Sequence, residues 1–211
     1  MNIKKKRNKF SLLINVNGNN ISFYSKNDNK NNLYNILASI AAIDSFVNIK
    51  RFKKNIFLDL KIPNGRGDIS KIKIRNKKIF LIDETYNSNP LSLKTAIENY
   101  DKINLKNSRK YLILGDMLEL GKYSIEQHKL ISKIINKTKI NQVYAIGKYI
   151  KETFKGLKSS KKAKILNKNF DIINLINNNL NNNDYLMIKG SNSTGLHKMI
   201  TNLKQRYKYV I

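Results

Sequence analysis

The sequence predicts an α/β protein in which a Rossmann-like, parallel sheet carries helices on its faces. From Asp83 onward, short apolar runs typical of strands alternate with helical patterns, a rhythm that favours parallel strands joined by right-handed crossovers. Polar residues and glycines follow these runs directly, at the carboxyl edge of the predicted sheet, where α/β proteins bind ligands. The residues in these positions are Asp83, Glu84, Gly115, Asp116, Gly147 and Lys189.

Composition narrows the class of protein. The 211 residues can bury one sizeable core, or one core and part of another. The formal net charge is +27, from 41 basic and 14 acidic side chains, and such a charge suits partners such as nucleic acid or an anionic membrane. The basic residues are scattered, however, and they accompany an excess of Asn and Ile that is typical of AT-rich genomes. We therefore interpret the charge mainly as codon bias and expect no specific nucleic-acid partner.

Several classes of site and location are excluded by the sequence. The chain contains no cysteine, which excludes disulfides and thiolate chemistry. Basic residues open the chain, but the apolar run Leu12–Ile14 behind them is too short for the core of a signal peptide. No run of about 20 apolar residues is present that could span a membrane. These features predict a cytoplasmic protein without a membrane span.

Two elements are predicted near the start of the chain. Apolar and polar residues alternate over residues 11–25 around Asn17-Gly18, a pair that is typical of tight hairpins. Apolar residues recur at helical spacing from Asn32 to Val47, which predicts a helix with one buried face.

A turn and a strand pair are predicted next. Proline and glycines indicate a turn over residues 63–67. Strands are predicted over 69–74 and 78–82. The rhythm of the sequence changes after this pair, so we place a domain boundary between Ile82 and Asp83.

The rest of the chain alternates between the two kinds of element. Asn89 is a favourable N-cap for the first helix of this part, and Pro90 suits the first helical turn because it has no backbone donor to lose. Ser124 and Gln127 form the pattern of a capping box before the second helix. Strands are predicted over 111–114, 142–146, 163–166 and 185–188, and helices over 91–100, 125–136, 170–180 and 196–207.

The most specific motif lies between the predicted strand 78–82 and the first of these helices. Ile-Asp-Glu-Thr-Tyr-Asn-Ser-Asn-Pro at residues 82–90 resembles the Asp-Asp-Ser-Tyr-Asn-Ala-Asn-Pro signature of the MurF-type branch of the Mur ligase family. Four further motifs resemble those of the family and occur in the same order. They are Asn-Asn-Leu-Tyr-Asn at 31–35, Gly-Arg-Gly at 65–67, Gly-Asp-Met-Leu-Glu-Leu-Gly at 115–121 and Lys-Gly-Ser at 189–191.

The resemblance implies both a fold and an activity. Residues 1–82 would be the C-terminal part of the family's central ATP-binding domain, and residues 83–211 would be its Rossmann-like C-terminal domain. This branch of the family adds D-alanyl-D-alanine to UDP-N-acetylmuramoyl-tripeptide in peptidoglycan precursor synthesis. The reaction uses ATP and Mg²⁺ and proceeds through an acyl phosphate.

One element of such a ligase is missing from the sequence. No Gly-x-x-x-x-Gly-Lys-[Ser/Thr] phosphate loop is present in the 211 residues. The resemblance places this loop and most metal ligands upstream, so we expect the chain to be the C-terminal portion of a ligase. One alternative is a non-catalytic remnant or a subunit that completes a separately encoded N-terminal half. A small, basic nucleic-acid-binding protein is the other.

The resemblance also implies a set of cofactor-binding residues. Asn32 and Asn35 would contact the nucleotide, and Arg66 would contact its phosphates, for which a permanently charged guanidinium is well suited. Asp83 and Glu84 would hold the ribose hydroxyls. Plain helix caps are the alternative for the two asparagines, and an ordinary surface arginine in a turn is the alternative for Arg66.

A second set would bind the acceptor substrate. Lys189, Ser191 and Asn192 would hold the carboxylate of D-alanyl-D-alanine, while residues of the 82–90 motif would position it. Asn31 and Asn192 stand where the family has His and Arg, so a role for these two side chains does not carry over unchanged. The substrate-binding residues implied are Tyr86, Asn87, Asn89, Lys189, Ser191 and Asn192.

Three other polar residues have structural alternatives. Asp116 and Glu119 follow a predicted strand, and they could be charges at the start of a helix, favoured by its dipole. His128 shares a helical face with Ile131 and Ile135, so we predict a buried structural histidine rather than a catalytic base. No metal site is predicted within this chain.

Overall fold

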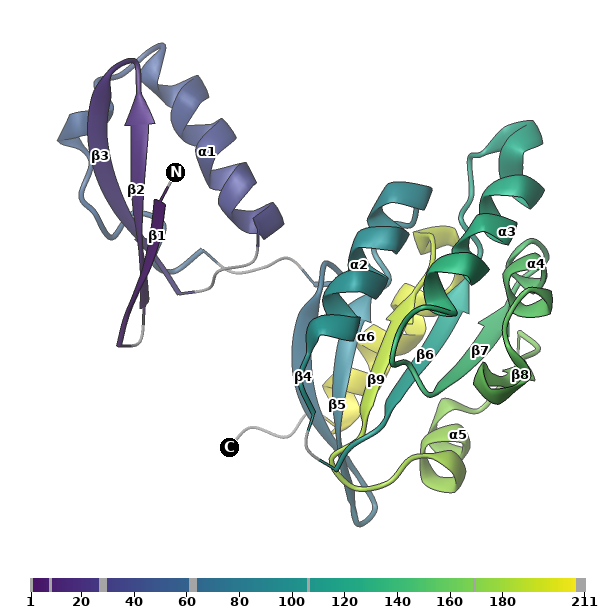
Figure 1. The fold of residues 1–211 in the computed structure, drawn as a ribbon. Helices are drawn as coiled ribbons and strands as arrows, with labels where there is room; N and C mark the ends of the chain where they lie inside the picture. Colours follow the sequence, from purple (N-terminus) through teal and green to yellow (C-terminus); the bar gives the residue numbers. More distant parts are fainter. Residues whose placement is uncertain are drawn as a thin grey trace. The chain divides into compact units, whose positions relative to one another are not determined.

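A computed structural model of the chain describes residues 2–7, 9–26, 30–60, 64–105, 107–168 and 170–207. The chain forms two compact units, residues 1–62 and residues 63–211, and each is described here by itself. Figure 1 shows the elements of both units. No helix in the described ranges combines the length and the apolar character that a membrane crossing requires.

The first unit is an antiparallel sheet covered by one helix. Its strands are β1 (Asn2–Lys6), β2 (Lys9–Val16) and β3 (Asn19–Ser25), and they are followed by α1 (Lys30–Asp44) and the 3-10 helix η1 (Ile49–Arg51). Asn17 and Gly18 have φ values of 48° and 79°, so the predicted hairpin turns through two residues with positive φ. The predicted helix is also confirmed. Its apolar face helps to form a core of Leu12, Ile14, Phe23, Leu33, Ile36, Ile40 and Ile49.

The second unit is built on a six-stranded sheet with the strand order β4-β5-β9-β6-β7-β8. The strands from β5 to β8 are parallel, and β4 is antiparallel to β5 at one edge. All the strands predicted in this part of the chain are confirmed. They are β4 (Asp68–Ile74), β5 (Lys77–Glu84), β6 (Lys110–Gly115), β7 (Gln142–Ile146), β8 (Lys162–Ile165) and β9 (Tyr185–Lys189).

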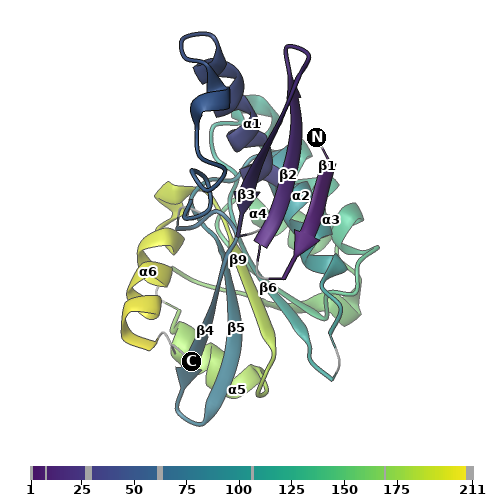
Figure 2. The ribbon, with the colours of Figure 1, turned by 90° about the vertical axis from the view of Figure 1, so that its left-hand side faces the viewer.

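Helices cover both faces of this sheet, as Figures 1 and 2 show. The helices are α2 (Pro90–Lys102), α3 (Ser124–Ile135), α4 (Ile150–Lys155), α5 (Ile172–Asn179) and α6 (Leu196–Tyr207). Successive strand residues point to opposite faces. Leu112 and Leu114 therefore join the core under α2, α3 and α4, whereas Tyr111 and Ile113 join the core under α5 and α6. The sheet is a doubly covered α/β sheet, as predicted.

Two details differ from the sequence-based predictions. The six-residue helix α4 was not predicted, because a segment this short shows no helical periodicity. The prediction of a capping box formed by Ser124 and Gln127 is wrong. Ser124 already has helical φ and ψ, and its hydroxyl donates to the Gly121 carbonyl at 2.8 Å, because the 3-10 helix η2 (Gly121–Tyr123) leads directly into α3.

The predicted boundary between Ile82 and Asp83 lies inside β5. This strand pairs with β4 on one side and with β9 on the other, so the β4–β5 hairpin belongs to the sheet of the second unit. By their contacts, residues 63–82 group with the rest of that unit. The structural division of the chain therefore falls about 20 residues before the change of rhythm in the sequence.

Candidate functional site

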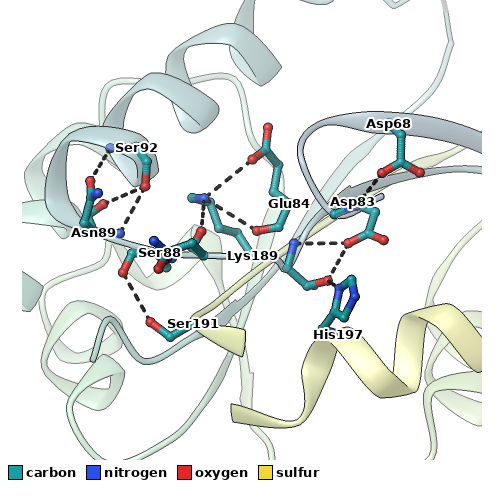
Figure 3. Close-up of polar contacts among 12 residues, drawn as sticks. Asp68, Asp83, Glu84, Ser88, Asn89, Ser92, Lys189, Ser191 and His197 are labelled. Carbon is teal, nitrogen blue, oxygen red and sulfur yellow. Dashed lines mark hydrogen bonds and ion pairs between the residues drawn. The ribbon is translucent and has the colours of Figure 1, made fainter. Parts of the chain in front are cut away.

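The segments that follow β5 and β9 meet at the carboxyl edge of the sheet. The two strands are hydrogen-bonded neighbours, and Glu84 lies opposite Lys189 at their ends. The first segment, residues 84–89, is called the 84–89 turn below. It joins β5 to α2 and contains most of the polar residues of the 82–90 motif. Figure 3 shows its contacts.

The amide side chains of the 84–89 turn shape the start of α2. Asn89 accepts a hydrogen bond from the Ser92 amide at 2.8 Å, and the Ser92 hydroxyl accepts one from the Asn89 amide at 3.0 Å. Asn89 is therefore the N-cap, with Pro90 in the first turn, as predicted. The Asn87 side-chain oxygen accepts from the Ser88 amide at 2.7 Å. Both side-chain oxygens therefore accept hydrogen bonds from nearby backbone amides, one in the 84–89 turn and one in the first turn of α2.

Lys189 lies under the 84–89 turn and is only 1% exposed. Its ammonium group donates to the Asn87 carbonyl at 2.8 Å and lies 3.5 Å from the Glu84 carboxylate. Burial lowers the pKa of Lys189 and raises the pKa of Glu84, while the charge of each partner opposes the shift of the other. In this arrangement, Lys189 supports the turn from below instead of facing solvent.

Ser191 and Asn192 lie just beyond β9. The Ser191 hydroxyl donates to the Ser88 carbonyl at 3.2 Å and accepts from the Leu118 amide at 3.0 Å. Ser191 therefore ties the 84–89 turn to the segment after β6. Asn192 opens the 3-10 helix η4 (Asn192–Thr194), and its side chain is exposed.

Asp83 is fully buried, and both of its carboxylate oxygens are engaged. One oxygen accepts from the amide and the hydroxyl of Thr85 at 3.1 and 2.5 Å. The other oxygen pairs with Lys204 of α6 at 2.5 Å, and Lys204 also pairs with Asp68 at 2.5 Å. Of the two acidic residues predicted to hold a ribose, only Glu84 has a partly exposed carboxylate, at 24%.

Arg66 is exposed in the turn just before β4, and the structure brings it beside the 84–89 turn. Its guanidinium carbon is 4.3 Å from the centre of the Tyr86 ring. The Tyr86 amide donates to the Gly65 carbonyl at 3.0 Å, and the Gly67 amide donates to the Asp83 carbonyl at 2.7 Å. Gly65 and Gly67 have φ values of 79° and 90°, which glycine adopts without strain.

His197 of α6 belongs to the same group of residues, although it was not predicted. Its Nδ1 atom lies 3.0 Å from the Thr85 hydroxyl, and its ring meets the Tyr86 ring edge-on with centres 6.2 Å apart. The Thr85 hydroxyl donates to Asp83, so it accepts from His197 and Nδ1 carries the proton. His197 and Lys204 are seven residues apart and therefore lie on the same face of α6. This spacing could have been used to predict that one face of the helix makes polar contacts.

Asp116 and His128, two of the other polar residues singled out from the sequence, make structural contacts. The Asp116 carboxylate accepts three amide hydrogen bonds of 2.7 to 3.0 Å from residues 148–150, at the start of α4. Its charge therefore sits at a helix start, although the helix is α4 and not the one that follows it in sequence. A Cβ atom at Gly147 would lie 2.4 Å from the Asp116 carboxylate, so this site requires glycine.

His128 is a buried structural histidine, as predicted. Its Nε2 atom accepts from the Met117 amide at 3.0 Å, and its Nδ1 atom lies 2.6 Å from the Ser124 carbonyl oxygen. Since an amide can only donate and a carbonyl can only accept, Nδ1 carries the proton and Nε2 does not. Burial lowers the pKa of His128, which favours this neutral form.

The two asparagines predicted to contact a nucleotide belong to the first unit. Asn32 is buried and Asn35 is exposed, and both lie inside α1, which begins at Lys30. Simple N-capping is therefore not their role. Within the residues that the structure describes, no three His, Asp or Glu side chains gather in a way that could hold a metal ion.

Comparison with known proteins identifies relatives of the chain. The profile of the family described as "Mur ligase, glutamate ligase domain" matches residues 71–192. A UDP-N-acetylmuramoyl-tripeptide–D-alanyl-D-alanine ligase of Buchnera aphidicola subsp. Baizongia pistaciae is 31% identical over 176 residues, which cover 82% of this chain and 37% of that protein. The Bacillus subtilis ligase of the same name is 28% identical over 177 residues, covering 82% and 38%. The chain thus spans less than two fifths of the length of these relatives.

Solved structures show the same fold. A crystal structure of MurF from Acinetobacter baumannii matches with a TM-score of 0.71 and 20% identity, covering 96% of this chain and 44% of that one. MurF from Thermotoga maritima in complex with ADP matches with a TM-score of 0.66 and 20% identity, covering 98% and 46%. At this level of identity, the two structures establish the architecture of the chain.

Proposed function

The chain belongs to the Mur ligase family, and from this premise we propose that it is the C-terminal portion of an ATP-dependent amide ligase. The complete enzyme would add D-alanyl-D-alanine to UDP-N-acetylmuramoyl-tripeptide in peptidoglycan precursor synthesis, in the cytoplasm. Two curated relatives with this activity in their names support the proposal, since each matches over 82% of the chain. The structural observation that carries it is the meeting of Arg66, Tyr86 and Glu84 at the carboxyl edge of the sheet.

The residues at this edge fit a nucleotide. Arg66 offers an exposed guanidinium, whose planar fork of donors matches phosphate oxygens. Glu84 offers a partly exposed carboxylate, which can accept hydrogen bonds from ribose hydroxyls. When bound, ATP would supply the phosphoryl group that activates the peptide carboxylate. We assign phosphate contact to Arg66 and ribose contact to Glu84. Asp83 would stabilise the turn through its contacts with Thr85 and Lys204.

Further nucleotide and metal contacts belong to other parts of the proposed enzyme. We assign to Asn32 and Asn35, within the first unit taken by itself, the amide contacts to a nucleotide that the family resemblance implies. As the family resemblance implies, the ligands of Mg²⁺ would come mainly from an upstream part that carries the phosphate loop. A separately encoded N-terminal half would supply that part.

The acceptor D-alanyl-D-alanine would bind beside the 84–89 turn. Tyr86 and Asn192 have exposed side chains and would contact it directly. The remaining residues would act by fixing the shape of the turn, since their side-chain oxygens or ammonium group bond to its backbone or cap its helix. These residues are Asn87, Asn89, Lys189 and Ser191.

Complementation tests the proposal. The 211-residue chain lacks a phosphate loop, which in such enzymes cradles the β- and γ-phosphates. Purified alone, the chain should therefore form no amide bond. Mixed or co-expressed with a phosphate-loop-bearing N-terminal half of a related ligase, it should restore ATP-dependent ligation. Ligation by the chain alone would contradict the assignment of the phosphate loop to another segment, and a folded mixture that never ligates would favour a non-catalytic remnant.

A further inference from the structure

Arg66 is exposed, yet its guanidinium is held against one partner. A free arginine side chain must lose rotamer entropy when it is fixed on a phosphate. Contact with the Tyr86 ring, at 4.3 Å, reduces that cost in advance because it restricts the side chain before a ligand arrives. The position of Arg66 therefore depends on what holds the Tyr86 ring, which is itself 43% exposed.

His197 contacts the Tyr86 ring with its own ring. The two rings meet edge-on, a favourable geometry for aromatic pairs, with centres 6.2 Å apart. The imidazole is oriented by its hydrogen bond to Thr85, which is fully buried and in turn bonds to Asp83. This chain of contacts connects the exposed Tyr86 ring to a buried ion pair between Asp83 and Lys204.

The backbone leaves little room for another arrangement. A Cβ atom built at Gly65 would lie 3.0 Å from Nδ1 of His197 and 2.9 Å from the Tyr86 amide. The turn that carries Arg66 is thus packed directly against both partners. Asp68 fixes the same turn, because its carboxylate accepts from the Gly65 amide at 2.7 Å and pairs with Lys204. Through His197 and Lys204, α6 contacts both turns that form the proposed nucleotide site.

We propose that His197 is a positioning residue for Arg66. It holds the Tyr86 ring in the orientation against which the Arg66 guanidinium lies, and so it determines where the proposed phosphate contact points. The value of this contact for catalysis rests on the proposed function, whereas the positioning itself is a property of the chain alone.

The positioning can be measured by NMR on the full chain with isotopically labelled arginine. The sequence has six arginines, so the spectrum is simple, and Arg66→Lys identifies the Arg66 signals by their loss. A guanidinium over an aromatic ring places the neighbouring methylene protons in the ring's shielding region, so these signals should be displaced upfield. The variants compared are His197→Ala, His197→Phe, which keeps a ring, and Lys198→Ala, an exposed neighbour on α6.

We expect His197→Ala to lose most of the upfield displacement, His197→Phe to retain more of it, and Lys198→Ala to match the wild type. Arg66 signals in His197→Ala that coincide with the wild type would overturn the proposal. If the alanine variant does not fold, His197→Asn replaces it, because asparagine keeps a donor for Thr85 but no ring. A wild-type displacement in a folded His197→Asn variant would equally overturn the proposal.

A kinetic test on the reconstituted enzyme separates positioning from general damage. His197→Ala should raise KM for ATP by about threefold to thirtyfold and change kcat less, in the range of coupling between contacting residues. The same substitution should have no further effect when Arg66→Ala is already present. Independent, multiplicative effects of the two substitutions would contradict the proposal. An active enzyme that is indifferent to Arg66→Ala would instead contradict the proposed function and leave the NMR result to decide on His197.

Discussion

At the scale of single residues, the Lys189–Glu84 pair controls the shape of the 84–89 turn. Lys189 is buried and satisfies the Asn87 carbonyl as well as the Glu84 carboxylate. Removing one partner of such a pair is costly because the other charge stays desolvated, whereas removing both is often tolerated. The pair therefore gives a stability prediction whose pH dependence has a definite sign.

Lys189→Met should destabilise the chain by about 1–3 kcal/mol at pH 7, the usual cost of an unsatisfied buried group. The pKa of Glu84 is raised above its ordinary value of 4.5, and it should rise further without Lys189, so protonation favours the folded state as pH falls. The loss should accordingly be smaller at pH 5 than at pH 7. Urea denaturation of the wild type and of Lys189→Met at both pH values measures this difference in the free energy of unfolding.

The control for Lys189→Met is Lys73→Met, which removes an exposed lysine from β4 and should change stability little at either pH. Adding Glu84→Gln to Lys189→Met should recover part of the lost stability and remove most of the pH dependence. A loss that is equal at pH 5 and pH 7, or that Glu84→Gln deepens, would show that the pair is not coupled in this way.

Arg66 and Asp83 differ in how well their contacts could be predicted from the sequence. Arg66 lies near the 84–89 turn because the β4–β5 hairpin, a local pairing, sets Asp68 opposite Asp83. Both strands were predicted, so this proximity was within reach of the sequence. The burial of Asp83 could not be predicted in this way. Its partner Lys204 is 121 residues away in the chain and contacts Asp83 only when α6 is packed on the sheet.

At the scale of elements, lysines satisfy the carbonyl ends of several helices. Such carbonyls lack intrahelical partners and carry the negative end of the helix dipole, so a cation nearby is favourable. Lys110 donates to the Asp101 carbonyl in α2 at 2.6 Å, and Lys162 donates to the Lys155 carbonyl of α4 at 2.9 Å. Part of the high lysine content, interpreted from the sequence as codon bias, therefore has a structural use. Lys77 donates to the carbonyl of Leu180, the C-cap residue of α5, whereas Lys161 donates to the Thr138 and Ile140 carbonyls in the loop after α3.

Lys110→Met should therefore destabilise the chain although it removes a charge from a strongly basic protein. Lys110 is 4% exposed, and burial lowers its pKa, so its ammonium depends on this contact. We expect a loss of about 1.5–3 kcal/mol, the range for a hydrogen bond to a charged group. Thermal unfolding measures it, with Lys129→Met, an exposed lysine in the middle of α3, as the control. A Lys110→Met variant as stable as the control would contradict the capping role.

Elements with a regular pattern were the ones that the sequence could predict. The strands and longer helices of the second unit follow from apolar periodicity and from caps such as Asn89. The strand β1 was not predicted, because all of its side chains are exposed and show no alternation. Helix α4 was missed because its six residues show no helical periodicity and because its start is fixed by Asp116, which lies more than 30 residues earlier in the chain.

At the scale of the whole molecule, we propose that the chain is one part of a larger enzyme and carries a surface that contacts the nucleotide. It spans 37% and 38% of two relatives named as D-alanyl-D-alanine ligases. Its second unit presents Arg66 and Glu84 at one sheet edge, and its first unit carries Asn32 and Asn35 on α1. We propose that this sheet edge contacts a nucleotide whose phosphates are held by an upstream part with a phosphate loop.

Ligation by the reconstituted enzyme with Arg66→Ala and Glu84→Ala tests this claim most directly. Loss of a charge-assisted hydrogen bond typically costs about 1.5–3 kcal/mol, so each variant should lose roughly tenfold to more than a hundredfold in kcat/KM for ATP. Arg75→Ala, which removes an exposed arginine at the opposite end of β4, should retain wild-type activity. If the reconstituted enzyme is active and Arg66→Ala and Glu84→Ala both match the wild type, this edge of the sheet does not contact the nucleotide.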